Sequence, residues 1–278
     1  PWFNAIGEAF STVATGGFST HDDSFAHYSN HAVHWIAVLF MLLSGLNYGL
    51  HFMAFRKGEW RSYFQDIECV TYIRSVLLVS VVIVAALILS GLYHDHALAF
   101  LHGIFTVVSI MTTTGLTMVD FQPWPSALSV LLLWAGFVGG CAASTTGGLK
   151  QIRMILMRKQ SELAFWRLIH PQAVCNLRVG DKIISWELMQ SVYGFVYVYF
   201  TIFLILLFLL MGFGLDLETA VSDLVACLAN VGIPIGHASA PFSALNDPSK
   251  LILIFAMVVG RLEIFTVLVL LLPEYWRK

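Results

Sequence analysis

The sequence predicts an all-α membrane protein built from repeated units in which a short re-entrant segment lies between two spanning helices. Three observations predict this class. Apolar residues make up 58% of the 278 positions and charged residues only 12%, about half the charged share of an ordinary soluble domain. Several apolar stretches are long enough to cross a bilayer. Shorter stretches between them end in polar, glycine-bearing strips of similar spacing.

The longest apolar stretches predict the spanning helices. A helix needs about 20 mostly apolar residues to cross the hydrocarbon core. Segment 124–138 is too short to span unaided and runs into Gly139 and Gly140. The stretches that reach or approach the required length are 31–54, 70–92, 187–211 and 250–272.

Three further stretches, 1–12, 97–111 and 217–229, have the length of a short helix and are moderately apolar. They cannot cross the bilayer. Each one stops at a glycine-bearing loop, which is typical of a helix that enters the membrane and turns back. We therefore predict three re-entrant helices.

The placement of lysine and arginine predicts the orientation. If the helices alternate in direction, thirteen of the fifteen basic residues fall on one side, and only Lys250 and Arg261 do not. Aspartates gather on the other side. The positive-inside rule puts the basic loops in the cytoplasm. Among these, the segment 151–186 predicts either a docking face for a partner or a helix on the lipid surface.

The strips after the re-entrant helices share one layout. In "STVATGGFST" (11–20) and "SIMTTTGLTMVD" (109–120), a serine precedes a glycine by six residues. The third strip, "CLANVGIPIG" (227–236), occupies the same place, although Asn230 and Pro234 break its threonine pattern. The common layout predicts an internal repeat.

The physics of such strips is specific. Non-helical backbone at membrane depth survives only where it is buried in protein or lines a wet cavity. Several strips around one axis point their carbonyls at a common line, where they can replace the water shell of a cation. Glycine permits the backbone angles that this needs. The helix ending at each strip directs its negative dipole end towards the same line.

A second polar break, "VGGCAASTTGGLK" (138–150), interrupts an apolar helix with two pairs of glycines. Glycine pairs break helices. We interpret the segment as a flexible barrier on the cytoplasmic side of the strips. The alternative is a glycine-rich seam for helix packing.

Arg261 lies near the middle of the apolar stretch 250–272. An intramembrane charge by default faces a wet cavity or a partner. One hypothesis is a fixed positive barrier to cations, because arginine keeps its charge in nearly any environment. The other is a structural ion pair with Glu263 or a bond to a carbonyl, although Glu263 would point about 200° away on an ideal helix.

The three strips, the repeated units and the segment "GGCAASTTGGLKQIRMILMRKQ" (139–160) resemble the Trk/Ktr/HKT superfamily of potassium transporters. The similarity is closest to its bacterial TrkH-type pore subunits and covers nearly the whole chain. Members of that family have four helix–pore-loop–helix units around a pseudo-fourfold ion pore. The resemblance implies that this chain begins in the pore helix of the second unit, with the first unit missing.

The resemblance also implies residue roles. Gly17, Gly115 and Gly232 would be the glycines of a selectivity filter whose backbone carbonyls bind K⁺. The filter residues would be Ala14, Thr15, Gly16, Gly17, Thr112, Thr113, Thr114, Gly115, Ala229, Asn230, Val231 and Gly232. The residues of an intramembrane gating loop and its pore-facing arginine would be Gly139, Gly140, Ser144, Thr145, Thr146, Gly147, Gly148 and Arg261.

The resulting organisation is three pore repeats: residues 1–61, residues 62–170 with the gating loop at 138–150, and residues 171–278. The resemblance implies potassium uptake across the bacterial inner membrane by a homodimer, gated by a cytoplasmic nucleotide-binding ring of the TrkA type. We expect no cofactor in this chain besides the transported K⁺, and no nucleic acid partner. A Na⁺-permeable relative, and symport with H⁺ or Na⁺, remain open.

The runner-up class is an intramembrane enzyme, such as a protease or a lipid transferase. The sequence has no GxSxG, no HExxH and no paired carboxylates within the apolar stretches. A purely structural scaffold would leave the strips unexplained. The histidines on the proposed outer side predict an interfacial role or a pH effect, and their spacing gives no metal triad. They are His21, His27, His31, His34, His94, His96, His102 and His237.

Overall fold

The computed structural model describes residues 2–121, 123–172, 176–180, 182–236 and 242–276. Nearly all regular structure in these residues is helical, which confirms the predicted class. The strands that they contain are β1 (Arg178–Val179) and β2 (Lys182–Ile183), which pair antiparallel with Arg178 opposite Ile183. This small hairpin was not expected in the connection 151–186.

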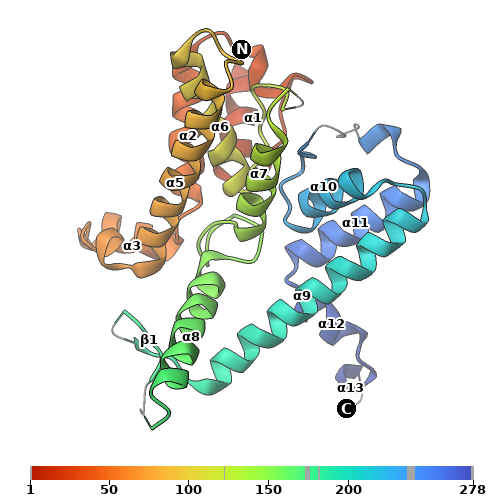
Figure 1. The fold of residues 1–278 in the computed structure, drawn as a ribbon. Coiled ribbons are helices and arrows are strands. Elements are labelled where there is room, and N and C mark those ends of the chain that lie inside the picture. Colours follow the sequence, from red (N-terminus) through yellow and green to blue (C-terminus); the bar gives the residue numbers. More distant parts are fainter. Residues whose placement is uncertain (1, 122, 173–175, 181, 237–241, 277–278) are drawn as a thin grey trace.

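The helices follow one another along the whole chain (Figure 1). Several begin at an asparagine or aspartate whose side chain accepts a hydrogen bond from the first turn. The α-helices are α1 (Trp2–Val13), α2 (His31–Ser44), α3 (Tyr48–Lys57), α4 (Ser62–Gln65), α5 (Ile67–Leu89), α6 (His96–Met111), α7 (Ser126–Val138), α8 (Gln151–Ile169), α9 (Trp186–Gly212), α10 (Leu217–Leu228), α11 (Asp247–Arg261), α12 (Ile264–Leu271) and α13 (Pro273–Trp276). Short 3₁₀ turns, η1 (Ser24–His27) and η2 (Phe242–Ala244), lie between them.

Two of the predicted spanning helices are continuous. Helix α5 has 23 residues and α9 has 27, and both are long and apolar enough to cross a membrane. Helix α9 is preceded by Ser185, whose hydroxyl caps it, and ends at Gly212. The predicted short helix at 124–138 is confirmed as α7.

The other two predicted spans are wrong as continuous helices. Helices α2 and α3 meet at 98°, and α11 and α12 meet at 106°. At the first break, the Asn47 side chain accepts from Gly49 N–H at 2.8 Å and starts a new helix in a new direction. At the second break, Glu263 takes a left-handed backbone with φ of 56°. Each pair can serve as one broken span by length and composition.

The three predicted re-entrant helices are confirmed as helices α1, α6 and α10. Helix α10 is capped by Asp216, which accepts from Thr219 N–H at 3.1 Å. This hydrogen bond holds the pKa of Asp216 below its ordinary value. Helix α6 packs against α2, α5 and α7, and α10 packs against α7, α9 and α11.

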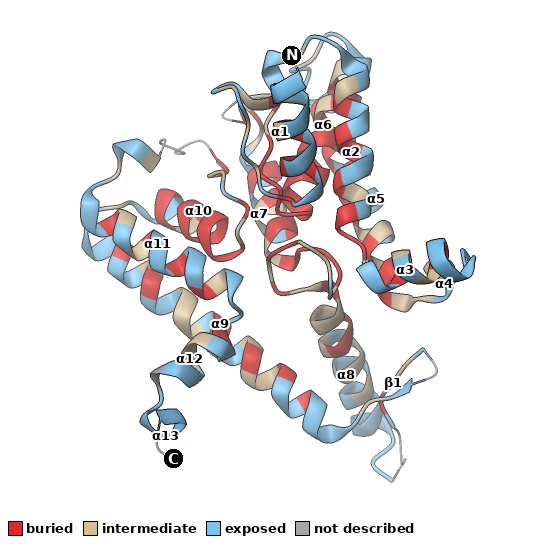
Figure 2. Cartoon of the chain, turned by 180° about the vertical axis from the view of Figure 1, so that it is seen from behind, coloured by how far each residue is buried: buried red, intermediate tan, exposed pale blue. Residues whose placement is uncertain are grey.

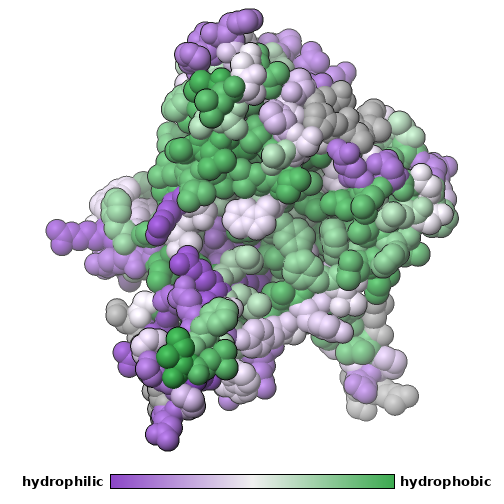
Figure 3. Space-filling view, viewed as in Figure 1, coloured by the Kyte–Doolittle hydropathy of each residue, from purple (hydrophilic) through white to green (hydrophobic). Residues whose placement is uncertain are grey.

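Two large apolar cores lie around α6 and α10. One joins α2, α5, α6 and α7, and the other joins α9, α10 and α11. A smaller third core joins α8 and α9. Figure 2 shows the buried residues concentrated on α6, α7 and α10, between the outer helices. Large apolar side chains cover much of the outer surface, visible as green areas in Figure 3. An apolar exterior around buried short helices is the pattern of a protein that sits in lipid.

Candidate functional site

The strips after α1, α6 and α10 have the same backbone conformation. The strip glycines are Gly17, Gly115 and Gly232. In each strip, the N–H of the residue just before this glycine donates a hydrogen bond back to a carbonyl in the last turns of the preceding helix. The carbonyl belongs to the residue six positions before the glycine. The bonded pairs are Gly16 N and Ser11 O, Thr114 N and Ser109 O, and Val231 N and Ala226 O, each at 2.8 Å. The internal repeat inferred from spacing is therefore present in the geometry.

The backbone angles repeat as well. In each strip the glycine and the residue two positions before it lie in the left-handed region, which a residue with a side chain rarely adopts. The values are 50° at Thr15, 52° at Thr113 and 58° at Asn230, then 73° at Gly17, 79° at Gly115 and 87° at Gly232. Asn230 thus breaks the threonine pattern of the third strip without changing its conformation, since asparagine tolerates this region better than most residues.

The strips lie side by side. A Cβ atom added to Gly17 would lie 2.2 Å from the Thr114 carbonyl oxygen, and one added to Gly115 would lie 2.1 Å from that of Val231. Glycine is therefore required by close approach as well as by φ. A Cβ added to Gly232 would meet no atom within 4 Å in the described part of the chain. The three strips form a row of neighbouring carbonyl-bearing segments that is open beside the last.

The polar break after α7 lies against these strips. Gly147 N–H donates to Thr113 Oγ1 at 2.6 Å, and the Thr15 hydroxyl donates to Thr145 O at 3.1 Å. A Cβ on Gly147 would lie 2.2 Å from Ala229 O. One segment therefore touches all three strips. It is not helical between α7 and α8, so the alternative of a glycine-rich helix seam is wrong.

Hydrogen bonds join the two ends of this segment. Leu149 N–H donates to Phe137 O at 3.0 Å, and Gln151 N–H donates to Gly140 O at 2.9 Å. Within the loop the hydroxyls of Ser144 and Thr146 are 2.7 Å apart. The segment is a compact loop whose two ends meet, and we call residues 139–150 the inner loop.

Sequence reasoning missed Glu68, which ties down both ends of the inner loop. This side chain, in the first turn of α5, is 6% exposed. Its Oε1 accepts from Ala142 N–H at 2.6 Å and from Ile152 N–H at 3.1 Å. No local pattern could have revealed it, because Ala142 lies 74 residues away in the chain.

We expect Glu68→Ala to destabilise the protein by about 2 kcal/mol, because two partly buried backbone donors lose their acceptor. Thermal unfolding of the purified protein in detergent measures this. Glu162→Ala is the matched control, since Glu162 is exposed and pairs with Arg158 on the same helix; it should cost less than about 0.5 kcal/mol. Equal costs for the two variants would contradict the structural role of Glu68.

Arg261 lies elsewhere than predicted. It is the last residue of α11, at the break before α12, rather than in the middle of a continuous helix. Its Nη1 donates to Thr145 O of the inner loop at 3.0 Å. Glu263 instead pairs with Arg153 of α8 at 3.0 Å. Two partners were considered for Arg261. It bonds to a backbone carbonyl, that of Thr145, and it does not pair with Glu263.

A polar cavity of about 220 Å³ lies between the inner loop, α9 and the α11–α12 break. Lys150 Nζ donates to Thr146 O, and the Arg153 guanidinium lies 3.8 Å from the centre of the Phe195 ring. Three basic side chains therefore surround the loop below the strips. Glu263, which is paired with Arg153, lines the same cavity.

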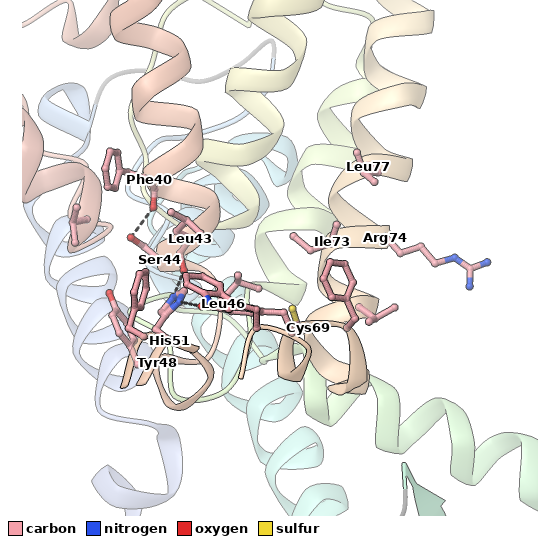
Figure 4. Close-up of a pocket in the computed structure, with 16 residues that line it drawn as sticks. Phe40, Leu43, Ser44, Leu46, Tyr48, His51, Cys69, Ile73, Arg74 and Leu77 are labelled. Atoms are coloured by element: carbon pink, nitrogen blue, oxygen red, sulfur yellow. Dashed lines mark hydrogen bonds between the residues drawn. The ribbon is translucent and has the colours of Figure 1, made fainter. Parts of the chain in front are cut away.

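A separate apolar groove of about 980 Å³ runs along α2, α3 and α5 (Figure 4). His51 lines it and is already bonded twice, to Tyr63 Oη at 2.7 Å and to Leu43 O at 2.9 Å. In Figure 4 the Arg74 side chain points away from the other labelled residues. The groove lies outside the strips, and both ring nitrogens of His51 are occupied by these two bonds.

The outer histidines form no metal site in the described residues. The rings of His21 and His27 stack at 3.6 Å, and His34 bonds to Phe25 O at 3.0 Å. No group of three or more His, Cys, Asp or Glu side chains that could hold a metal is found in that part of the chain. His237 lies outside the described residues.

Comparison with known proteins gives one consistent result. The model of the TrkH family, described as "Cation transport protein", matches residues 1–278. The chain is 42% identical to the Trk system potassium uptake protein TrkH of Halomonas elongata over 277 residues and 38% identical to that of Escherichia coli K12 over 276 residues. These matches cover 100% and 99% of this chain, and 57% of each relative.

A solved structure agrees. The crystal structure of the potassium transporter TrkH from Vibrio parahaemolyticus matches with a TM-score of 0.95 and 40% identity, over 99% of this chain and 59% of that one. The chain therefore spans less than three fifths of the length of the proteins that it matches.

Proposed function

This chain belongs to the TrkH family of cation transport proteins, and on that basis we propose that its three strips line a K⁺ pathway for potassium uptake. The observation that carries the proposal is the row of three strips with equal backbone angles and neighbouring carbonyls. Gly232 leaves open the side on which a ring of four would place its fourth strip. The names of the relatives, all potassium uptake proteins, support K⁺ as the cargo.

The chemistry of the strips suits an unreactive, partly dehydrated cation. Backbone carbonyls can replace its water shell without covalent steps. The relatives are named as potassium uptake proteins, which favours transport over an intramembrane enzyme. The filter residues are those inferred from the sequence, from Ala14 to Gly17, from Thr112 to Gly115 and from Ala229 to Gly232.

The inner loop and Arg261 form the proposed gate. The loop lies directly against the strips and is held there by Thr113, Thr15 and Arg261. Each such bond contributes about 1 kcal/mol net. These three alone favour the seated loop by a factor on the order of a hundred, in addition to the bonds that Glu68 and Gly45 O accept from the loop and its end. An opening stimulus must therefore displace the loop or Arg261.

We further propose an inner-membrane protein with its basic loops in the cytoplasm, acting as a homodimer with a TrkA-type nucleotide-binding ring. Support comes from the basic segments: α3, α8 with the hairpin, and the C-terminal end carry most of the lysines and arginines. In Figure 1, α8 and α13 lie at the end of the molecule away from the N-terminus.

Uptake of Rb⁺, a K⁺ substitute, into vesicles containing the full-length gene product tests the proposal. We expect Rb⁺ uptake that exceeds Na⁺ uptake. A folded, inserted protein that moves neither ion would refute the function. Preference for Na⁺ would leave the pathway standing and assign the protein to the Na⁺-permeable relatives.

Deleting residues 139–147 should raise basal Rb⁺ uptake by a factor on the order of a hundred, the preference that the three bonds impose. The two ends left by the deletion lie near each other, because Leu149 N and Phe137 O are 3.0 Å apart. Initial uptake rates per inserted molecule measure the effect. If the inserted deletion protein conducts no better than the wild type, the loop does not obstruct the pathway.

A further inference from the structure

Glu8 ties the first strip to its own helix. The side chain lies on α1 and is 6% exposed. Its Oε1 accepts from Ser19 Oγ at 2.6 Å and from Thr20 N–H at 3.2 Å. Ser19 and Thr20 are the second and third residues after Gly17. One carboxylate oxygen therefore holds the segment that leaves the strip.

The corresponding positions in the other repeats make no such tie. Glu8, Thr106 and Asp223 each lie nine residues before their strip glycine. The hydroxyl of Thr106 and both carboxylate oxygens of Asp223 are buried and have no hydrogen-bond partner in the described structure. The contact of Glu8 is therefore particular to the first strip.

In the described structure, the other two strips are held by neutral groups. After Gly115, Thr117 N–H donates to Ser24 Oγ at 3.2 Å and Thr117 O accepts from Phe25 N–H at 2.9 Å. Ser109 Oγ donates to Leu116 O at 2.6 Å, and Ser222 Oγ accepts from Ile235 N–H at 2.7 Å. At comparable distances, a hydrogen bond to an ionised carboxylate is roughly twice as strong as one between neutral groups. The three strips thus share a conformation and differ in what holds each of them in place.

Two side chains of α1 hold the segment after the first strip: Glu8, and Asn4, whose Nδ2 lies 2.8 Å from His21 Nε2. A cavity of about 530 Å³ lies between α1 and α2, lined by Glu8, Thr12, His27 and Tyr28. Glu8 Oε2 and the Tyr28 hydroxyl are buried without a hydrogen-bond partner in the described residues. Packing behind the segment is loose there, so the hydrogen bonds carry the restraint.

We propose that Glu8 is a positioning residue for ion selectivity: its carboxylate fixes the segment after Gly17 and so sets the place of the first strip's carbonyls. The inference rests on the proposed filter. Selectivity by a carbonyl cage depends on where the carbonyls are held. An untied segment lets the first strip adapt to the smaller Na⁺.

The test uses the full-length gene product in vesicles, with initial rates of Rb⁺ and Na⁺ uptake. Glu8→Ala should lower the Rb⁺-to-Na⁺ ratio by about tenfold, the equivalent of one charge-assisted hydrogen bond. Glu8→Gln keeps a carbonyl acceptor and should stay within about threefold of wild type. Ser19→Ala leaves Glu8 unchanged and removes the donor of the shorter of its two hydrogen bonds. It should also lower the Rb⁺-to-Na⁺ ratio.

Thr106→Val is the matched control, because it alters the equivalent position on α6 at nearly constant volume and removes no bond. Its ratio should equal that of wild type. An unchanged ratio in folded Glu8→Ala overturns the proposal, as does a fall in Glu8→Gln as large as in Glu8→Ala. If Glu8→Ala does not insert, Ser19→Ala decides, and an unchanged ratio there overturns it.

Failure of the filter itself looks different. A wild-type protein that takes up neither ion refutes the proposed function. A selective wild type whose ratio is indifferent to Glu8→Ala and Ser19→Ala refutes only the role of Glu8.

Discussion

Replacing Arg261 by alanine is expected to increase K⁺ flux by a factor on the order of a hundred. A fixed positive charge at about 6 Å from the ion path, in an effective dielectric near 20, repels a cation by roughly 3 kcal/mol. If this point limits the rate, that energy corresponds to about a hundredfold. The substitution also removes the bond from Nη1 to Thr145 O, which loosens the inner loop in the same direction.

Two comparison variants separate charge from structure. Arg261→Lys keeps the charge and should keep most of the block. Arg153→Gln removes a neighbouring charge that is already paired with Glu263 and should change flux far less. Rb⁺ flux per inserted molecule and thermal stability are measured on the same samples. A loss of stability in Arg261→Ala without a gain in flux would assign Arg261 a purely structural role.

Gly115→Ser is expected to reduce the Rb⁺-to-Na⁺ uptake ratio by at least about tenfold. A side chain here meets two obstacles: φ is +79°, and the new Cβ would lie 2.1 Å from Val231 O. Backbone strain of this kind costs about 1–3 kcal/mol, equivalent to about fivefold to more than a hundredfold in a binding preference, and the clash adds to it. The new side chain also pushes against Val231 O of the neighbouring strip. We therefore expect both strips to be displaced.

Gly91→Ser provides the control. Gly91 has a similar φ of +68°, but a Cβ there would meet no atom within 4 Å among the described residues. Gly91→Ser therefore introduces the backbone strain of a positive φ without a steric clash. Its Rb⁺-to-Na⁺ uptake ratio should match that of wild type. If Gly115→Ser gives the wild-type ratio in folded protein, Gly115 does not contribute to the filter.

What the sequence predicted well were features with a local cause. The short helices α1, α6 and α10 and the strips that follow them are visible as apolar runs that stop at glycine. Their equivalence follows from spacing alone. The expected irregularity of the third strip did not materialise, because Asn230 adopts the same left-handed backbone as Thr15 and Thr113.

What the sequence could not predict depends on contacts between distant parts of the chain. The bends after α2 and α11 lie inside apolar runs, where hydropathy cannot distinguish one straight helix from two. Because the chain bends at Glu263, Arg261 lies at the end of α11 and not near the centre of one continuous helix. In the sequence, Glu68 looks like an ordinary acidic residue at the start of a helix. Its role becomes visible only in the fold, which places Ala142 and Ile152 beside it.

The two kinds of contact around the strips also imply an order of assembly. Each strip bends out of its own helix through bonds that span at most about six residues. The contacts between strips join residues roughly a hundred positions apart, as with Gly17 and Thr114 or Gly115 and Val231. Local contacts form early and long-range ones late, because the chain must first close large loops. We therefore expect each strip to take its shape as its own unit is synthesised, and the ion path to appear only when the units dock.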